Sequence, residues 1–183
     1  MNKTIFFLLF LFTVNVFSYE LSINDSCTYI FKAKKWYDAE LKTIVTKINE
    51  NSFKLKILQR NGAVKASKTL TFPKELKKDN ILKTIIDLTK SYTDYNIKIN
   101  YSHIEDNYKF LYRQKKYKGI LVKAHLLIND KIYKISYIFS KEIPVTGLFR
   151  FTITQDINSK KKYKFKNIML IKECKTKGKL IKL

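Results

Sequence analysis

The fold of this chain is clearest in residues 120–139, ILVKAHLLINDKIYKISYIF. Two apolar runs flank a polar segment at residues 129–131. In the second run the side chains at every other position, from Tyr133 to Phe139, are aromatic or aliphatic and share one face. A period of two is typical of a β-strand with one buried face, and an Asn-Asp pair favours a turn. The stretch therefore predicts an antiparallel β-hairpin.

The same alternation continues on both sides of this hairpin. It predicts further strands at residues 27–33, 41–48, 53–57, 63–72, 97–101, 108–113, 148–154 and 163–172, with an Asn61-Gly62 hairpin turn. Residues 175–183 are predicted to form a frayed basic tail. The predicted fold class is α+β, mainly β: a single curved antiparallel sheet or a partly open barrel of about eight or nine strands with one packed helix.

The helix is predicted at residues 74–92, where the pattern changes from alternation to helical spacing. Ile81, Ile85 and Leu88 recur at intervals of three and four residues, and Asp79 can cap the first turn. Polar residues occupy the opposite face. We expect the apolar side of this helix to pack on the sheet, because a helix of this length gains most of its stability from such burial.

The chain begins with MNKTIFFLLFLFTVNVFS, residues 1–18. Lys3 precedes a short apolar run, and Val16 and Ser18 stand where a small-residue cleavage site requires them. This order is typical of a secretory signal peptide, and the run is shorter than the roughly 20 residues of a membrane-spanning helix. We expect residues 1–18 to be a cleaved signal peptide, with an uncleaved anchor as the alternative. Residues 19–183 then form a single β-rich domain that is periplasmic or secreted and has no later transmembrane span.

Two cysteines, Cys27 and Cys174, lie near opposite ends of the mature segment. An even number of cysteines in an exported protein favours a disulfide. Cys27 alternates with Tyr29 and Phe31 on an apolar face. We expect a Cys27–Cys174 disulfide that ties the first strand to the last, and two buried free thiols are the alternative.

The net charge of the chain indicates which classes of molecule it could bind. The chain has 37 Lys and Arg against 15 Asp and Glu, a net charge of +22, and only three of the basic residues are arginine. Such a charge attracts polyanions, whereas scarce arginine argues against sequence-specific nucleic-acid recognition. One basic stretch interleaves lysines with aromatic residues, a pattern that can bind polyanions, although a solvated edge strand is the alternative. The predicted contacts are Lys160, Lys161, Lys162, Lys164 and Lys166.

The sequence carries no recognised catalytic motif. It lacks a Gly-x-Ser-x-Gly elbow and a glycine-rich phosphate loop. The two histidines, His103 and His125, are too few for a predicted metal site. Paired acids such as Glu105 and Asp106 lie among many lysines, and most such ion pairs are solvated. We predict no catalytic, cofactor-binding or metal-binding residue.

Residues 137–148, YIFSKEIPVTGL, read as a strand followed by a Ser-x-x-Ile-Pro-x-x-Gly-Leu turn. This segment resembles a turn of the DUF3108-like group of exported β-sheet proteins, which is loosely similar in shape to the lipoprotein carriers LolA and LolB. The resemblance implies a curved sheet with a helix on its concave side and a cavity for an apolar ligand, and it supplies no catalytic residues. Proline and glycine also favour such a turn for purely local reasons.

Together these observations predict an exported, non-enzymatic binding protein. Its inner face, rich in tyrosine and phenylalanine, could hold an apolar or amphipathic ligand. The first alternative is a basic surface-interaction protein that binds anionic polymers or surfaces of the cell envelope. The second is a hydrolase whose site the sequence does not reveal.

Overall fold

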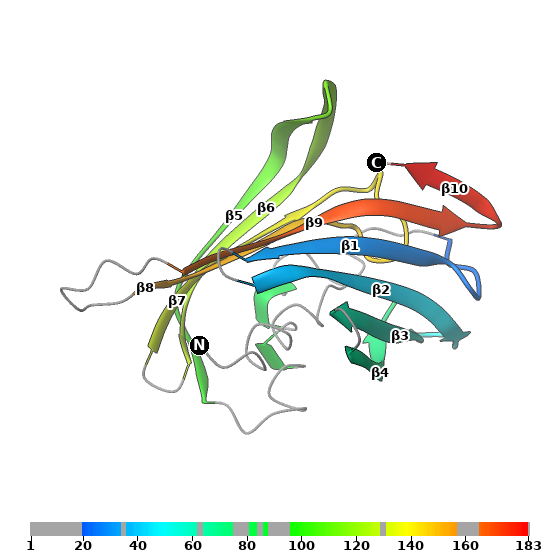
Figure 1. Ribbon diagram of the computed structural model, residues 1–183. Coiled ribbons are helices and arrows are strands. Elements are labelled where there is room, and N and C mark those ends of the chain that lie inside the picture. Colours follow the sequence, from blue (N-terminus) through cyan, green and yellow to red (C-terminus); the bar gives the residue numbers. More distant parts are fainter. Residues whose placement is uncertain are drawn as a thin grey trace.

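The architecture is one open antiparallel sheet (Figure 1). The computed structural model describes residues 20–33, 36–61, 64–74, 81–83, 86–87, 96–128, 131–156 and 165–182. The strands within these residues are β1 (Ser26–Ala33), β2 (Trp36–Ile48), β3 (Ser52–Asn61), β4 (Val64–Pro73), β5 (Ile97–Tyr112), β6 (Lys115–Ile128), β7 (Lys131–Phe139), β8 (Leu148–Asp156), β9 (Phe165–Thr176) and β10 (Lys179–Lys182). Their order is β4-β3-β2-β1-β9-β8-β7-β6-β5, with β10 paired to β9 off this path. The end strands β4 and β5 do not pair with each other, so the predicted mainly-β open sheet is confirmed.

Two series of hairpins meet in the middle of the sheet. β1 to β4 pair in chain order, as do β5 to β9, as is common for strands that follow one another in the chain. The hairpin expected within residues 120–139 is present, with Ile128 opposite Lys131. The turn expected at Asn61 is also confirmed, because Asn61 lies opposite Val64. The two series join where β1 pairs with β9.

The core lies on the inner face of the sheet. Helical residues 81–83 and 86–87 pack there, and Ile81, Leu82 and Ile86 are at most 4% exposed within the same apolar core as the strands. The charged residues of this segment are exposed. The expected amphipathic contact of a helix with the sheet is therefore confirmed for these residues. The remainder of the predicted helix, apart from Lys74, lies outside the described part of the chain.

One predicted boundary inside the second half of the chain is wrong. Residues 97–101 and 108–113 were expected to be separate strands, but residues 97–101 and 108–112 belong to the single strand β5, and Arg113 lies in the turn that follows. The pairing of β5 with β6 shifts register between Ile99 and Tyr101 and again between Glu105 and Tyr108. β-bulges of this kind accommodate extra residues without ending a strand, which the alternation pattern could not reveal.

The predicted frayed tail is also wrong for the residues that the structure describes. β9 extends to Thr176, and β10 folds back so that Lys179 lies opposite Thr176. Lys177 and Gly178 have φ angles of 44° and 80°, which suit a two-residue hairpin turn. The amide of Lys177 also donates a hydrogen bond to Asp25 Oδ1 at 2.9 Å. This bond connects the turn to the segment that precedes β1.

The predicted signal peptide at residues 1–18 lies outside the described residues. Within the described residues, no helix has the length and the apolar character needed to cross a membrane.

Candidate functional site

The end of the β5–β6 hairpin extends past the neighbouring strand. β7 pairs with β6 only from Ile120 onward, so residues 108–119 form a two-stranded extension, which we call the ribbon. Its turn consists of Arg113 and Gln114, whose φ angles of 45° and 65° suit a two-residue hairpin. Figure 1 shows this pair of strands rising away from the body of the sheet. The ribbon is therefore the most projecting part of the described sheet.

One side of the ribbon is an aromatic cluster. Phe110 lies opposite Tyr117, and their ring centroids are 5.4 Å apart. The ring of Phe149, from the start of β8, lies 4.5 Å from Phe110 and 5.7 Å from Tyr117. Tyr112 meets Phe149 edge-on at 5.1 Å, and Tyr108 stacks on Phe110 at 6.1 Å. Aromatic pairs contribute about 0.5–1.5 kcal/mol beyond the burial of their area, so the cluster holds the ribbon against β8.

The position of Phe149 in this cluster depends on a β-bulge. Ile138 pairs with Arg150, whereas Phe139 pairs with Leu148, so Phe149 is the extra residue on β8. A bulge redirects the side chain of the extra residue. Phe149 is consequently 3% exposed and in contact with the ribbon.

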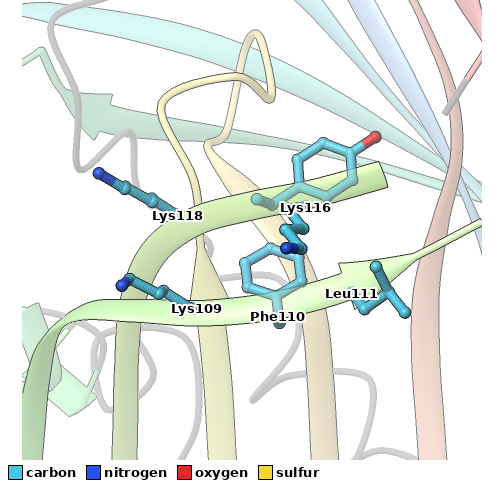
Figure 2. Close-up of a pocket in the computed structure, with 6 residues that line it drawn as sticks. Lys109, Phe110, Leu111, Lys116 and Lys118 are labelled. Carbon is cyan, nitrogen blue, oxygen red and sulfur yellow. The ribbon is translucent and has the colours of Figure 1, made fainter. Parts of the chain in front are cut away.

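The other side of the ribbon carries lysines and one leucine. Successive side chains of a strand point to opposite faces, so Lys109 and Leu111 leave β5 on the side away from Phe110. Lys118 lies directly opposite Lys109, and Lys116 lies opposite Leu111. Figure 2 shows Lys109 and Lys118 pointing in the same direction from the two strands. Leu111 is 67% exposed.

A hollow of about 570 Å³ runs along these side chains. It is lined by Lys109, Phe110, Leu111, Lys116, Tyr117 and Lys118 (Figure 2). The rings of Phe110 and Tyr117 lie on the other side of the ribbon, so the hollow combines the aliphatic surface of Leu111 and of the lysine side chains with three ammonium groups. Such a lining suits a ligand that has both an anionic and an apolar part.

Charge in the ribbon is entirely positive. Residues 108–119 contain five lysines and arginines and no Asp or Glu. One of them, Lys115, has a partner outside the ribbon: its Nζ lies 3.0 Å from Glu142 Oε2. The hydrogen bond to Glu142 raises the pKa of Lys115. The same Nζ stands 4.8 Å from the ring centroid of Tyr117, a cation–π contact.

The three lysines that line the hollow have no such partner among the described residues. Lys109, Lys116 and Lys118 make no ion pair with any carboxylate that the structure describes. Like charges directly opposite each other destabilise a sheet. The Lys109–Lys118 pair therefore has an electrostatic cost, and an anion bound between the two ammonium groups would remove it.

The loop at residues 140–147 supports the ribbon. The Ser140 hydroxyl donates a hydrogen bond to the Lys118 carbonyl at 2.9 Å, and the Ser140 amide donates to the Gly147 carbonyl at 2.7 Å. Val145 and Gly147 have φ angles of 69° and 67°, so the loop turns tightly. This geometry agrees with the local interpretation of the proline and glycine in this segment. At the other side of the loop, the hydroxyls of Thr146 and Tyr29 are hydrogen-bonded.

Gly119 marks the point where the ribbon leaves the sheet. A Cβ atom at this position would lie 1.9 Å from the Phe139 carbonyl oxygen and 3.4 Å from the Phe110 ring. A contact of 1.9 Å is impossible for any side chain. Only glycine lets the end of β7 approach β6 this closely at the base of the ribbon.

The predicted disulfide is confirmed. Cys27 of β1 and Cys174 of β9 are direct partners in the sheet and are bonded, across a sequence separation of 147 residues. Both are at most 1% exposed. The bond lies where the two series of hairpins meet, and Cys27 Sγ is 3.2 Å from the Pro144 carbonyl oxygen of the 140–147 loop. The disulfide was expected to tie the first strand to the last, but β9 is the next-to-last strand, because β10 follows it.

The predicted lysine contact lies mostly outside the described residues. Lys160, Lys161, Lys162 and Lys164 are outside the described residues. Lys166 lies in β9 opposite Thr154, and its side chain is not described. The structure therefore leaves this contact a prediction.

The titratable residues noted in the sequence do not assemble into a metal site among the described residues. His103, Glu105 and Asp106 are exposed on β5. His125 is half-buried, and its ring lies 5.2 Å from that of Tyr101.

The ribbon was not predicted from the sequence. Its signal is the alternation of aromatic with basic or aliphatic residues on both sides of Arg113-Gln114. Arg-Gln is not a common turn pair, so the two halves were not joined into one hairpin. Phe149 could not have been assigned to the cluster, because it lies far along the chain and depends on a bulge.

Comparison of the chain with protein-family models, with curated proteins and with solved structures finds no match.

Proposed function

We propose that this protein is an exported, non-enzymatic binding protein whose ribbon holds an anionic ligand with an apolar part. The observation that carries the proposal is the opposed pair of Lys109 and Lys118, which flanks a hollow and has no carboxylate partner among the described residues. A protein retains such repulsion at a cost in stability, and a bound anion would repay that cost.

The apolar part of the ligand follows from the other side chains of the hollow. Leu111 and the aliphatic parts of the lysine side chains line it, and Leu111 is largely exposed. The inner face of the sheet is a weaker candidate, because its described side chains are buried against one another and against residues 81–83 and 86–87. We therefore propose the ribbon, and not the inner face of the sheet, as the site for the expected amphipathic ligand.

Export is supported by two observations. The first is the order of charged, apolar and small residues in residues 1–18. The second is the Cys27–Cys174 disulfide, a bond that is common in oxidising compartments and rare in the cytosol. The net charge of +22 would also favour contact with anionic components of a cell envelope.

A short-chain anionic lipid tests the proposal. Dihexanoyl phosphatidylglycerol is monomeric at low concentration and carries one phosphate and two short acyl chains. Isothermal titration calorimetry should show binding that weakens as salt rises from 20 to 500 mM, because screening shortens the reach of each charge. The zwitterionic dihexanoyl phosphatidylcholine should bind much more weakly.

A pair of variants assigns the binding to the ribbon. Each lysine near an anionic headgroup contributes about 1 kcal/mol, so Lys109→Gln with Lys118→Gln should weaken binding about 30-fold. Lys42→Gln with Lys56→Gln is the matched control, since it removes two exposed charges from β2 and β3 and neither lysine lies opposite another lysine. Equal loss of affinity in both pairs would mean that net charge alone drives binding. No binding of either lipid would overturn the proposal.

A further inference from the structure

The positive charges of the ribbon are divided between its two sides. The guanidinium carbon of Arg113 stands 5.3 Å from the ring centroid of Tyr112, and Lys115 pairs with Glu142 and stands over the ring of Tyr117. These two cations therefore have partners on the aromatic side of the ribbon. The other three, Lys109, Lys116 and Lys118, line the hollow on the opposite side and pair with no described carboxylate.

The strand register places the three lysines and Leu111 at the corners of one block. Lys109 lies opposite Lys118, and Leu111 lies opposite Lys116. Within each strand the two residues are separated by one position, so all four side chains leave the same face of the ribbon. Alternate residues of a strand are about 6.5–7 Å apart, and directly opposite Cβ atoms are about 4.5–5.5 Å apart. Because lysine side chains are long and flexible, the three ammonium groups can converge on one anionic group beside Leu111.

The number of ammonium groups indicates the kind of anion that fits them. A phosphodiester carries one negative charge and would leave two of the three ammonium groups without a counter-charge. A phosphate monoester carries about 1.5 to 2 negative charges at pH 7, and the second phosphate of a diphosphate ester raises this to about three. Charge-assisted hydrogen bonds from all three lysines to one ligand are therefore best satisfied by a diphosphate.

We propose that the anionic part of the ligand is a diphosphate ester, held by Lys109, Lys116 and Lys118, and that its apolar chain lies on Leu111. This inference rests on the proposed function and names the class of ligand for the same site. Leu111 is the fourth corner of the block and is 67% exposed, so a chain leaving the diphosphate meets apolar surface there. The hollow of about 570 Å³ is within the usual range for small-molecule sites.

Two prenyl phosphates of equal chain length measure the preference for a diphosphate. Isothermal titration calorimetry compares geranyl diphosphate with geranyl monophosphate, each monomeric and in buffer without divalent cations. One additional lysine–phosphate contact should make the diphosphate bind about fivefold more tightly. Equal affinity for the two compounds would overturn the inference.

Lys116 provides the variant that distinguishes the second phosphate from the first. Lys116→Gln should weaken the binding of geranyl diphosphate about fivefold and that of geranyl monophosphate much less, because Lys109 and Lys118 remain for a single phosphate. Lys56→Gln is the matched control, since it removes one exposed charge from β3 and should leave both affinities nearly unchanged. Equal losses in the two variants would mean that net charge drives binding and would overturn the inference, as would equal losses for the two compounds.

Leu111 tests the position of the apolar chain. Leu111→Ser changes an exposed side chain, so the fold should be preserved. It should weaken the binding of geranyl diphosphate about fivefold and leave the affinity for inorganic pyrophosphate unchanged. Pyrophosphate that binds as tightly as geranyl diphosphate would overturn the contact of the chain with Leu111.

The outcomes separate this inference from the proposed function. Binding of dihexanoyl phosphatidylglycerol at the ribbon, with equal affinity for the two geranyl phosphates, would overturn the diphosphate and leave the proposed function standing. Failure to bind either the lipid or the geranyl phosphates would overturn both proposals.

Discussion

Lys109 and Lys118 lie directly opposite each other on β5 and β6, in a ribbon that contains no carboxylate. This arrangement lowers the stability of the fold and favours the binding of an anion. Lys118→Glu would replace repulsion with attraction, and an opposite-charge pair across two strands contributes roughly 0.2–1 kcal/mol. We expect the variant to unfold at a higher denaturant concentration and to lose its affinity for anionic lipid.

The matched control for this prediction is Lys56→Glu on β3, which lies opposite Thr69. This substitution makes the same change in net charge but removes no repulsion between two opposed lysines. Its stability should change less than that of Lys118→Glu, and its lipid affinity should stay near that of the parent. Lower stability of Lys118→Glu would contradict the argument.

Phe149 attaches the ribbon to β8. Phe149→Ala removes a side chain that is 3% exposed and contacts three rings of the ribbon. Buried Phe→Ala substitutions cost about 3–5 kcal/mol, and part of this loss should appear as local opening. Amide hydrogen exchange should therefore accelerate most in residues 108–119. Phe53→Ala, near the other end of the sheet, should leave the exchange of the ribbon unchanged in relation to the rest of β6.

Gly119→Ala tests the close approach at the base of the ribbon. The new Cβ would meet the Phe139 carbonyl oxygen at 1.9 Å, so the end of β7 must move away. We expect a loss of about 2 kcal/mol or more, in the range of overpacked cores, and broadened or shifted NMR signals around Ser140. Gly178→Ala is a useful comparison: it has a φ of 80° but no atom within 4 Å of the added carbon. It should cost only about 1–2 kcal/mol of backbone strain.

The Cys27–Cys174 bond closes a separation of 147 residues. Constraining so long a loop in the unfolded chain is worth up to about 5 kcal/mol. Cys27→Ala with Cys174→Ala should therefore lower the denaturant midpoint strongly, as should reduction of the parent protein under unfolding conditions. Denaturant titration followed by circular dichroism measures the change. A midpoint that is the same with and without the bond would show that β1 and β9 do not need it.

Two buried tyrosines make the protein sensitive to alkali. Burial raises the pKa of Tyr29 and of Tyr137 above the ordinary value of 10, although the hydrogen bond with Thr146 partly opposes the shift at Tyr29. The folded state then keeps protons that the unfolded state loses above pH 10. Stability should be unaffected by these groups below pH 10 and should fall above it, by about 1.4 kcal/mol per pH unit and per tyrosine.

Denaturant titrations between pH 8 and 11.5 check this expectation. Tyr137→Phe removes one of the two groups, so its stability should fall less steeply above pH 10. Tyrosinate absorbance should show that a fraction of the 12 tyrosines ionises only when the chain unfolds. Complete ionisation in the folded protein would contradict the predicted burial effect.

The features that were predictable from sequence are those that short segments encode. Alternation in residues 132–139 and the Asn61-Gly62 turn predicted strands and a hairpin that are present. Helical spacing predicted the burial of Ile81. The bulges in β5 and at Phe149 were not predictable, because a bulge depends on which residues the partner strand offers.

The strand-rich character of the chain and its positive charge follow from the sequence alone, and the presence of only two cysteines limits any disulfide within the chain to one pairing. These properties depend on residue type, local periodicity and number. The opposition of Lys109 and Lys118 and the packing of Phe149 against the ribbon are visible only in the folded chain. Such contacts depend on strand register and on long-range packing, and a shift of one residue in register would turn these side chains to the opposite face.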